Sequence, residues 1–287
     1  MNTLDESTGE SRNRNLLGSI LFISVIACLS WWVLVSYFQE RFIFPRFLVN
    51  TDVATSAPDD VEVLLVGEDV NVEAFLLPGA GSSESRPSPM IVMLHGNAEL
   101  IDDRLDMARR FSNLGYAVLL PEYRGYGRSG GSPGQEVIRG DVLEAIDRAT
   151  ARVDIDGNRV GYYGISIGTG VAADVALRRS PTCMVFVVPP ASISGFAWSF
   201  GAPPFLIRHP FRTDEALSRL SVPLLICSNA QDEVVPPEQA RMLHELAGKY
   251  STLLEFEGRH NFLFDESEEE RRRKAIEEFF TEHLLAP

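Results

Sequence analysis

The chain has 287 residues, of which 45% are hydrophobic and 23% are charged, proportions typical of a folded globular protein rather than a disordered one. Its 40 acidic residues outnumber its 26 lysines and arginines and give a formal net charge of -14. Because binding to nucleic-acid phosphates needs a surplus of positive charge, this composition argues against a nucleic-acid partner.

The first apolar segment, Leu16 to Phe38, contains no charged residue. At ~1.5 Å per residue it forms a helix of roughly 35 Å, long enough to cross a bilayer. A cleaved signal peptide is the alternative, but its apolar core normally has about 7–15 residues and ends at a small-residue site. Because this run is longer and ends in bulky aromatic residues, we expect a single-pass membrane anchor over residues 16–38, after a tail over residues 1–15.

The charges beside the anchor are evenly divided, with Arg12 and Arg14 before it and Arg41 and Arg46 after it. The free amino terminus adds one positive charge on the first side. By the positive-inside rule this favours a cytoplasmic N-terminus and an extracytoplasmic location for the rest of the chain.

After a connector over residues 39–60, strand-like runs alternate with helical runs through one domain of about 230 residues, 61–287. This alternation predicts an α/β fold with a mostly parallel sheet and helices on both faces. The expected strands are residues 61–66, 70–77, 90–94, 116–120, 159–164, 183–188, 223–228 and 252–256. The sheet should therefore have eight strands.

Residues 191–220 interrupt this pattern, because they have no clear period and are rich in Phe, Trp and Pro. We expect an insert here. Its aromatic residues fit either a cap that contacts an apolar acyl chain close to the bilayer, or a helix packed onto the core.

The segment Gly164-Ile165-Ser166-Ile167-Gly168 lies between a predicted strand and an Ala-rich run that predicts a helix. A G-x-S-x-G pattern in this context is typical of a nucleophile elbow, a tight turn that projects the serine oxygen into a cleft. The glycines leave room where a Cβ would clash with the neighbouring strand and helix. A helix-capping serine is the alternative, and we expect Ser166 to be a nucleophile.

A serine nucleophile needs a base within hydrogen-bonding reach. Among five histidines, His260 alone follows the last predicted strand on a loop, at the sheet edge where ligands bind in parallel α/β folds. The acid that orients the base should follow a strand that lies between serine and histidine in the chain. Asp232 meets this condition, with Glu233 as the neighbouring rival.

Catalysis also requires two backbone N–H donors for the oxyanion of the tetrahedral intermediate. The amide of Ile167, directly after the nucleophile, is one candidate. The amide of Asn97 is the other, because the turn His95-Gly96-Asn97-Ala98 ends a predicted strand and Gly96 permits the required backbone shape.

The motifs HGNA, YRGYGRS, GISIG, DEVVPP and GRHN, in this order, resemble the α/β-hydrolase superfamily. The resemblance is greatest to membrane-anchored α/β-hydrolase-domain proteins related to serine aminopeptidase-like hydrolases, and it covers residues 61–285. It implies the α/β-hydrolase fold with a short cap insert at about 191–220. Two positions depart from the pattern: Asn229, where relatives often have Gly, and Glu122, where many have Asp.

We therefore expect a serine hydrolase that cleaves ester, thioester or amide bonds of a small or lipid-like acyl substrate through an acyl-enzyme on Ser166. An aminopeptidase-like peptidase and a catalytically silent scaffold are the alternatives. Gly125–Gly130 matches G-x-G-x-x-G, but Pro133 keeps the chain in a loop, so we expect no dinucleotide and no other cofactor. The three cysteines have no zinc spacing and no HExxH occurs, so we expect no metal.

Overall fold

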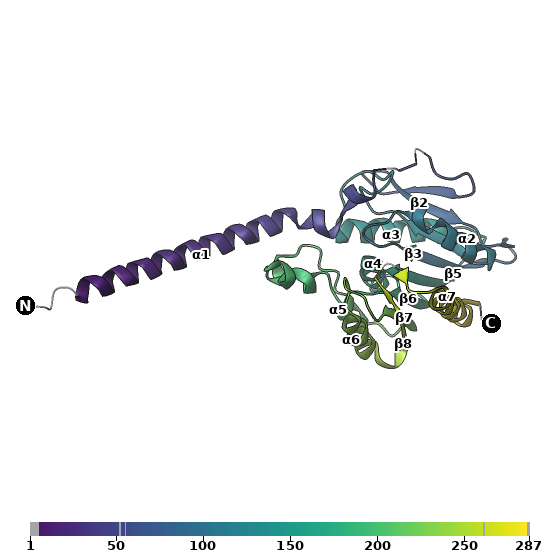
Figure 1. The fold of residues 1–287 in the computed structure, drawn as a ribbon. Coiled ribbons are helices and arrows are strands. Elements are labelled where there is room, and N and C mark those ends of the chain that lie inside the picture. The colour runs from purple at the N-terminus through teal and green to yellow at the C-terminus, as the bar shows by residue number, and fades with distance from the viewer. Residues whose placement is uncertain (1–5, 52, 55, 261, 286–287) are drawn as a thin grey trace, which may run out of the picture.

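The protein is described here from a computed structural model, in which residues 6–51, 53–54, 56–260 and 262–285 are placed. A helix of 38 residues, α1 (Glu6–Ile43), projects from an α/β domain formed by the rest of the chain (Figure 1). Asn261, the last residue of the GRHN motif, lies outside the described residues.

The central sheet has eight strands in the order β1-β2-β4-β3-β5-β6-β7-β8. The pairs β1–β2 and β2–β4 are antiparallel and all the others are parallel. The strands are β1 (Glu62–Val66), β2 (Val72–Leu77), β3 (Ser88–Leu94), β4 (Ala117–Pro121), β5 (Ile155–Ile165), β6 (Cys183–Val187), β7 (Leu224–Asn229) and β8 (Ser251–Phe256). The predicted eight-stranded, mostly parallel sheet is confirmed. A short hairpin, β9 (Gly258–Arg259) and β10 (Phe262–Leu263), follows β8.

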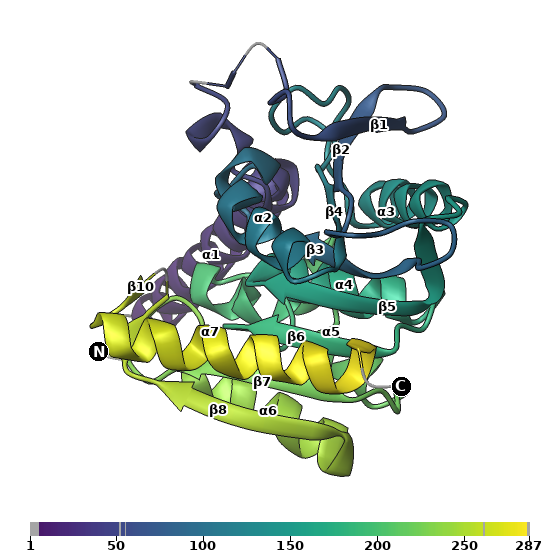
Figure 2. The same ribbon diagram turned by 90° about the vertical axis from the view of Figure 1, so that its right-hand side faces the viewer.

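Helices cover both faces of this sheet (Figure 2). One face packs against α2 (Leu105–Asn113) and α7 (Glu266–Phe280). The other packs against α3 (Gln135–Thr150), α4 (Ile167–Ala176) and α6 (Pro237–Ala247). Strands β3, β4, β6 and β7 are buried along their whole length, which explains why they are continuous apolar runs in the sequence rather than alternating ones.

Helix α1 runs beyond the predicted anchor and ends inside the domain. Its part Asn15–Ile43 is apolar and long enough to cross a bilayer. The predicted connector begins as the last turn of α1, and Phe44, just after it, is buried in the domain core. The Asn50 side chain then bonds to the backbone of Gly125 and Gly127. The helix is therefore fixed to the domain by packing and hydrogen bonds.

The predicted insert is present between β6 and β7. It consists of two 3₁₀ helices, Ser194–Phe200 and Pro204–Leu206, and the short helix α5 (Thr213–Leu217). The two 3₁₀ helices extend from the domain to the side of α1 (Figure 1). Other short helical turns lie at Arg46–Leu48, Ile101–Arg104, Gly248–Tyr250 and Thr281–Leu285.

Candidate active site

Ser166 occupies the sharp turn between β5 and α4. Its φ of 51° and ψ of -120° lie in a region that non-glycine residues rarely adopt, so the backbone is strained there. The turn fits tightly against the sheet. A Cβ on Gly168 would lie 2.2 Å from the carbonyl oxygen of Leu94, and one on Gly164 would lie 2.7 Å from the carbonyl oxygen of Gly168. Both glycines are therefore sterically required, as the motif predicts.

Three side chains that are far apart in the sequence meet at the carboxyl ends of β5, β7 and β8. His260 Nε2 lies 3.1 Å from Ser166 Oγ, and His260 Nδ1 lies 2.7 Å from Asp232 Oδ2. The Asp232 side chain is almost fully buried, and that of His260 is 13% exposed. The structure thus places hydroxyl, imidazole and carboxylate in one hydrogen-bonded chain, in the order that the sequence motifs imply.

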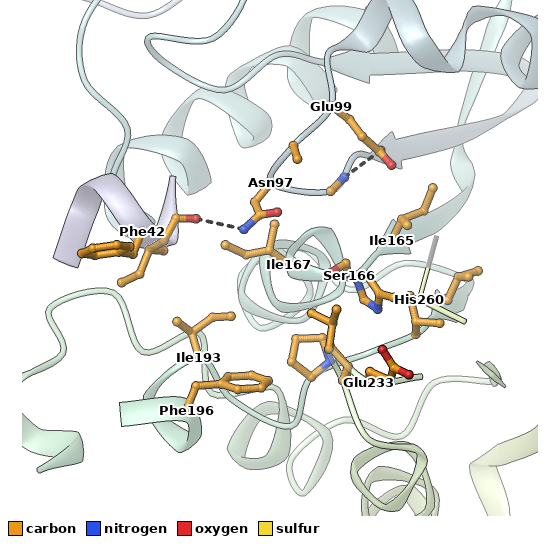
Figure 3. Close-up of a pocket in the computed structure, with 18 of the residues that line it drawn as sticks. Phe42, Asn97, Glu99, Ile165, Ser166, Ile167, Ile193, Phe196, Glu233 and His260 are labelled. Atoms are coloured by element: carbon orange, nitrogen blue, oxygen red, sulfur yellow. Dashed lines mark hydrogen bonds between the residues drawn. The ribbon is translucent and has the colours of Figure 1, made fainter. Parts of the chain in front are cut away.

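The segment that carries Asp232 and the segment that carries His260 are joined to each other. The second oxygen of Asp232, Oδ1, accepts hydrogen bonds from the backbone N–H groups of Val234 and Val235. The buried Asn229 side chain donates to the carbonyl oxygen of Arg259 at 2.6 Å. Asn229, which stands where relatives often have Gly, therefore supplies a hydrogen bond between these two segments. Glu233 is exposed at the pocket (Figure 3). The contact with the imidazole is made by Asp232.

The predicted oxyanion residues Asn97 and Ile167 line the same pocket and lie next to each other, on the side of Ser166 that faces away from His260 (Figure 3). The Asn97 loop is fixed by its own backbone contacts. The N–H of Gly96 donates to Glu99 Oε2 at 3.0 Å, and the carbonyl oxygen of Asn97 accepts from the Tyr126 hydroxyl. Neither bond uses the backbone N–H of Asn97. We propose that this N–H is an oxyanion donor.

A buried ion pair between His95 and Glu122 supports this loop. His95 Nε2 lies 2.8 Å from Glu122 Oε1, and His95 Nδ1 lies 2.8 Å from the carbonyl oxygen of Gly96. Burial lowers the pKa of His95, but the Glu122 carboxylate outweighs this and raises it above its ordinary value. The Tyr123 ring stacks on His95, with ring centroids 4.0 Å apart. The longer Glu at position 122 thus reaches the histidine of the HGNA motif.

The triad opens into a cavity of about 760 Å³, a size typical of small-molecule sites. One side is apolar and is built jointly by α1 and the insert. The lining residues there are Trp31, Val35, Phe42, Ile193, Phe196 and Ile207. The lining also includes the charged residues Glu99, Arg104, Glu233 and Arg272, of which Glu99 and Glu233 lie away from Phe42 and Ile193 (Figure 3). The cavity therefore has one apolar side and one charged side, with Ser166 between them.

Two groups of pocket residues were not identified from the sequence. The α1 residues were missed because a hydropathy run gives the length of a helix, not the direction in which it leaves the domain. Glu99 and Arg104 were missed because their roles depend on the path of a loop. A charged pair five residues apart at a helix start is the only local signal for them.

The G-x-G-x-x-G segment, residues 125–130, lies in the loop between β4 and α3. The N–H of Gly125 donates to the carbonyl oxygen of Gly130, which closes the segment into a loop, and α3 begins only at Gln135. The hydroxyl groups of Tyr126 and Tyr123 donate to the carbonyl oxygens of Asn97 and His95, so they hold the loop that follows β3.

Glu99→Gln is expected to lower the melting temperature in a pH-dependent way. Burial raises the pKa of the Glu99 carboxyl, but Arg104 beside it outweighs this effect, so the pKa lies below its ordinary value of 4.5. Its charge therefore stabilises the folded state above about pH 4.5, and this contribution is lost as the pH falls through the folded-state pKa. We expect a cost of roughly 1–3 kcal/mol at pH 7.

Thermal unfolding of wild type and Glu99→Gln in detergent, from pH 7 to pH 3, measures this difference. The difference in melting temperature between the two proteins should shrink toward pH 3. A gap that stays constant over this range would show that the carboxylate charge does not stabilise the loop.

A family model described as Serine aminopeptidase, S33 matches residues 85–209 of the chain. The chain is 26% identical over 227 residues to an uncharacterized protein of Mycobacterium tuberculosis, over 75% of this chain and 78% of that protein. It is 31% identical over 191 residues to the lysophosphatidylserine lipase ABHD12 of Rattus norvegicus, over 58% of this chain and 48% of that protein. The chain thus spans about half the length of this second relative.

Among solved structures, the fold is similar to that of Est1E from Butyrivibrio proteoclasticus bound to ferulic acid. The TM-score is 0.66 at 19% identity, over 78% of this chain and 100% of that chain. At this level of identity the likeness shows a common fold.

Proposed function

We propose that the chain is a membrane-anchored serine hydrolase of the α/β-hydrolase superfamily, which cleaves an ester bond of a lipid-like substrate through an acyl-enzyme on Ser166. The observation that carries the proposal is the chain of contacts from Asp232 through His260 to Ser166, next to an apolar cavity wall that includes α1.

In the proposed reaction the Ser166 oxygen attacks the acyl carbon while His260 Nε2 takes the hydroxyl proton. Asp232 accepts the hydrogen of Nδ1, which fixes the tautomer and stabilises the imidazolium. The backbone N–H groups of Ile167 and Asn97 stabilise the oxyanion. The imidazolium then protonates the leaving alcohol as the ester bond breaks. Water, activated by the same histidine, hydrolyses the acyl-enzyme and restores Ser166.

The two sides of the cavity support the substrate class. An acyl chain fits the apolar side, formed by residues such as Val35 and Phe196, and a polar leaving group fits the charged side near Arg104. The relative named a lysophosphatidylserine lipase acts, by its name, on a lipid of this kind. We therefore place esters above peptides for this chain.

The proposed location is a membrane, with α1 crossing it once and the catalytic domain on the extracytoplasmic side. The length and apolar composition of Asn15–Ile43 support the anchor. The charge at the amino terminus favours this orientation.

A series of p-nitrophenyl esters of increasing chain length, with aminoacyl p-nitroanilides beside them, tests the substrate class. The apolar wall predicts that kcat/KM rises with chain length, by up to about fourfold for each methylene that is buried. The aminoacyl amides should be poor substrates. Faster cleavage of aminoacyl amides than of the long esters would instead favour a peptidase, the reaction named in the matching family model.

A further inference from the structure

The surface next to α1 has an unusual composition. The 21 residues from Val187 to Ile207 contain no charged side chain, although 23% of the whole chain is charged. Within this stretch Trp198 is 67% exposed and Phe205 is 80% exposed, and neither lines the cavity. Large aromatic side chains that face outward on an uncharged segment are typical of a surface that is covered by a partner or by lipid.

The contacts between the insert and α1 show which part of the helix lies beside this surface. Trp32 Nε1 donates to the carbonyl oxygen of Gly201 at 3.2 Å. Seven residues further along, the Gln39 amide donates to the carbonyl oxygen of Leu206 and its oxygen accepts from the N–H of Arg208. The insert therefore lies along the last third of α1, parallel to about 10 Å of the helix axis.

The same part of α1 lies at the boundary of a bilayer. A hydrocarbon core of ~30 Å needs about 20 helical residues, which end near Val35 if they begin at Leu16, the first residue after the polar segment. Trp31 and Trp32 then lie within the last ~6 Å of the hydrocarbon core, next to the interfacial region in which Trp residues are enriched. Glu40, with Arg208 3.2 Å away, lies at the level of the headgroups.

We infer that residues 194–207 of the insert dip into the membrane beside α1, with Trp198 and Phe205 among the acyl chains. Because Ile193, Phe196 and Ile207 of the insert line the cavity together with Trp31 and Val35 of α1, the junction of the two segments is the place where lipid enters the cavity from the bilayer. This inference rests on the proposed membrane anchor and ester hydrolysis, and the partner to which it commits is a lipid surface.

Fluorescence of the full-length protein in lipid nanodiscs tests the position of the insert. The chain has three tryptophans, so the difference in emission between wild type and Trp198→Phe gives the signal of Trp198. We expect this signal to be quenched by phosphatidylcholine brominated on its acyl chains and to be insensitive to aqueous iodide. Quenching by iodide without quenching by brominated lipid would overturn the inference. Protection from both would show that Trp198 is covered by protein, either its own chain or a second copy, and would overturn it as well.

The remaining signal of Trp198→Phe comes from Trp31 and Trp32 on α1 and tests the anchor separately. If brominated lipid quenches these residues but not Trp198, the anchor stands and the inference about the insert fails. If it quenches none of the three, the proposed anchor itself fails.

Activity tests the entry route. For the double variant Trp198→Ser, Phe205→Ser we expect kcat/KM for a long-chain ester held in the nanodisc to fall at least about tenfold. Cleavage of a short, water-soluble ester should be unchanged, which also shows that the variant is folded. Val153→Ser is the matched control, because Val153 is 66% exposed but precedes β5, at the opposite end of this strand from Ser166. Equal losses on both esters, or no loss on either, would contradict lateral entry.

Discussion

Ser166→Ala is expected to lower kcat/KM for a good ester substrate by about 10⁴-fold or more. The variant keeps the pocket but has no oxygen with which to form the acyl-enzyme, so only binding and oxyanion stabilisation remain. Steady-state hydrolysis of the best p-nitrophenyl ester measures the change.

Ser199→Ala is the control for this prediction. Ser199 also lines the cavity, but it belongs to the insert and not to the elbow. Its removal should change kcat/KM by less than about threefold, since no bond-making step depends on it. A Ser166→Ala enzyme that retains a tenth or more of wild-type activity would refute the role of Ser166.

Asp232→Asn is expected to lower kcat by about 10⁴-fold with a small effect on KM. The buried carboxylate accepts the Nδ1 hydrogen of His260 at 2.7 Å, whereas an amide presents donors there and favours the wrong tautomer. Since the backbone N–H groups of Val234 and Val235 bond to the other oxygen, Oδ1, an Asn side chain has an acceptor for them, and the loop should keep its shape.

Glu233→Gln is the matched control for the acid. The residue is adjacent in the chain and lines the same cavity, but the His260 imidazole bonds to Asp232. We expect activity within about threefold of wild type. A large loss in Glu233→Gln with a small loss in Asp232→Asn would reverse the assignment of the acid.

The fold and the members of the candidate site were accessible from sequence for physical reasons that are local. Strands buried on both faces are continuous apolar runs. Parallel strands end at the same edge of the sheet, so Asp232 and His260, which follow the parallel strands β7 and β8, lie at one edge. The elbow has a steric signature of its own, because Gly164 and Gly168 have no space for a Cβ.

The walls of the cavity were not accessible in this way, because they depend on the path of the chain in space. The position of Trp31 and Val35 in the pocket follows from the angle at which α1 leaves the domain, which no period or composition specifies. The insert illustrates the same limit. Its aromatic residues were compatible with a cap or with core packing, and contacts of Gly201 and Leu206 with α1 place it at the helix.

The joint wall of α1 and the insert relates the proposed anchor to the proposed chemistry. The last residue of α1 also contacts the loop that carries Asn97, since the side-chain amide of Asn97 donates to the carbonyl oxygen of Ile43 at 3.4 Å (Figure 3). A helix that both spans the bilayer and contacts this loop would hold Ser166 at a fixed distance from the membrane surface. The anchor is thereby part of the proposed site as well as a tether.

Reaction of the full-length protein with a fluorophosphonate, followed by peptide mass mapping, tests most directly whether Ser166 is activated by its neighbours. The proposed triad predicts one covalent adduct, on Ser166, that forms rapidly in wild type, slowly in Asp232→Asn and not at all in Ser166→Ala. A well-folded wild-type protein that forms no adduct, or forms it on another serine, would contradict the account.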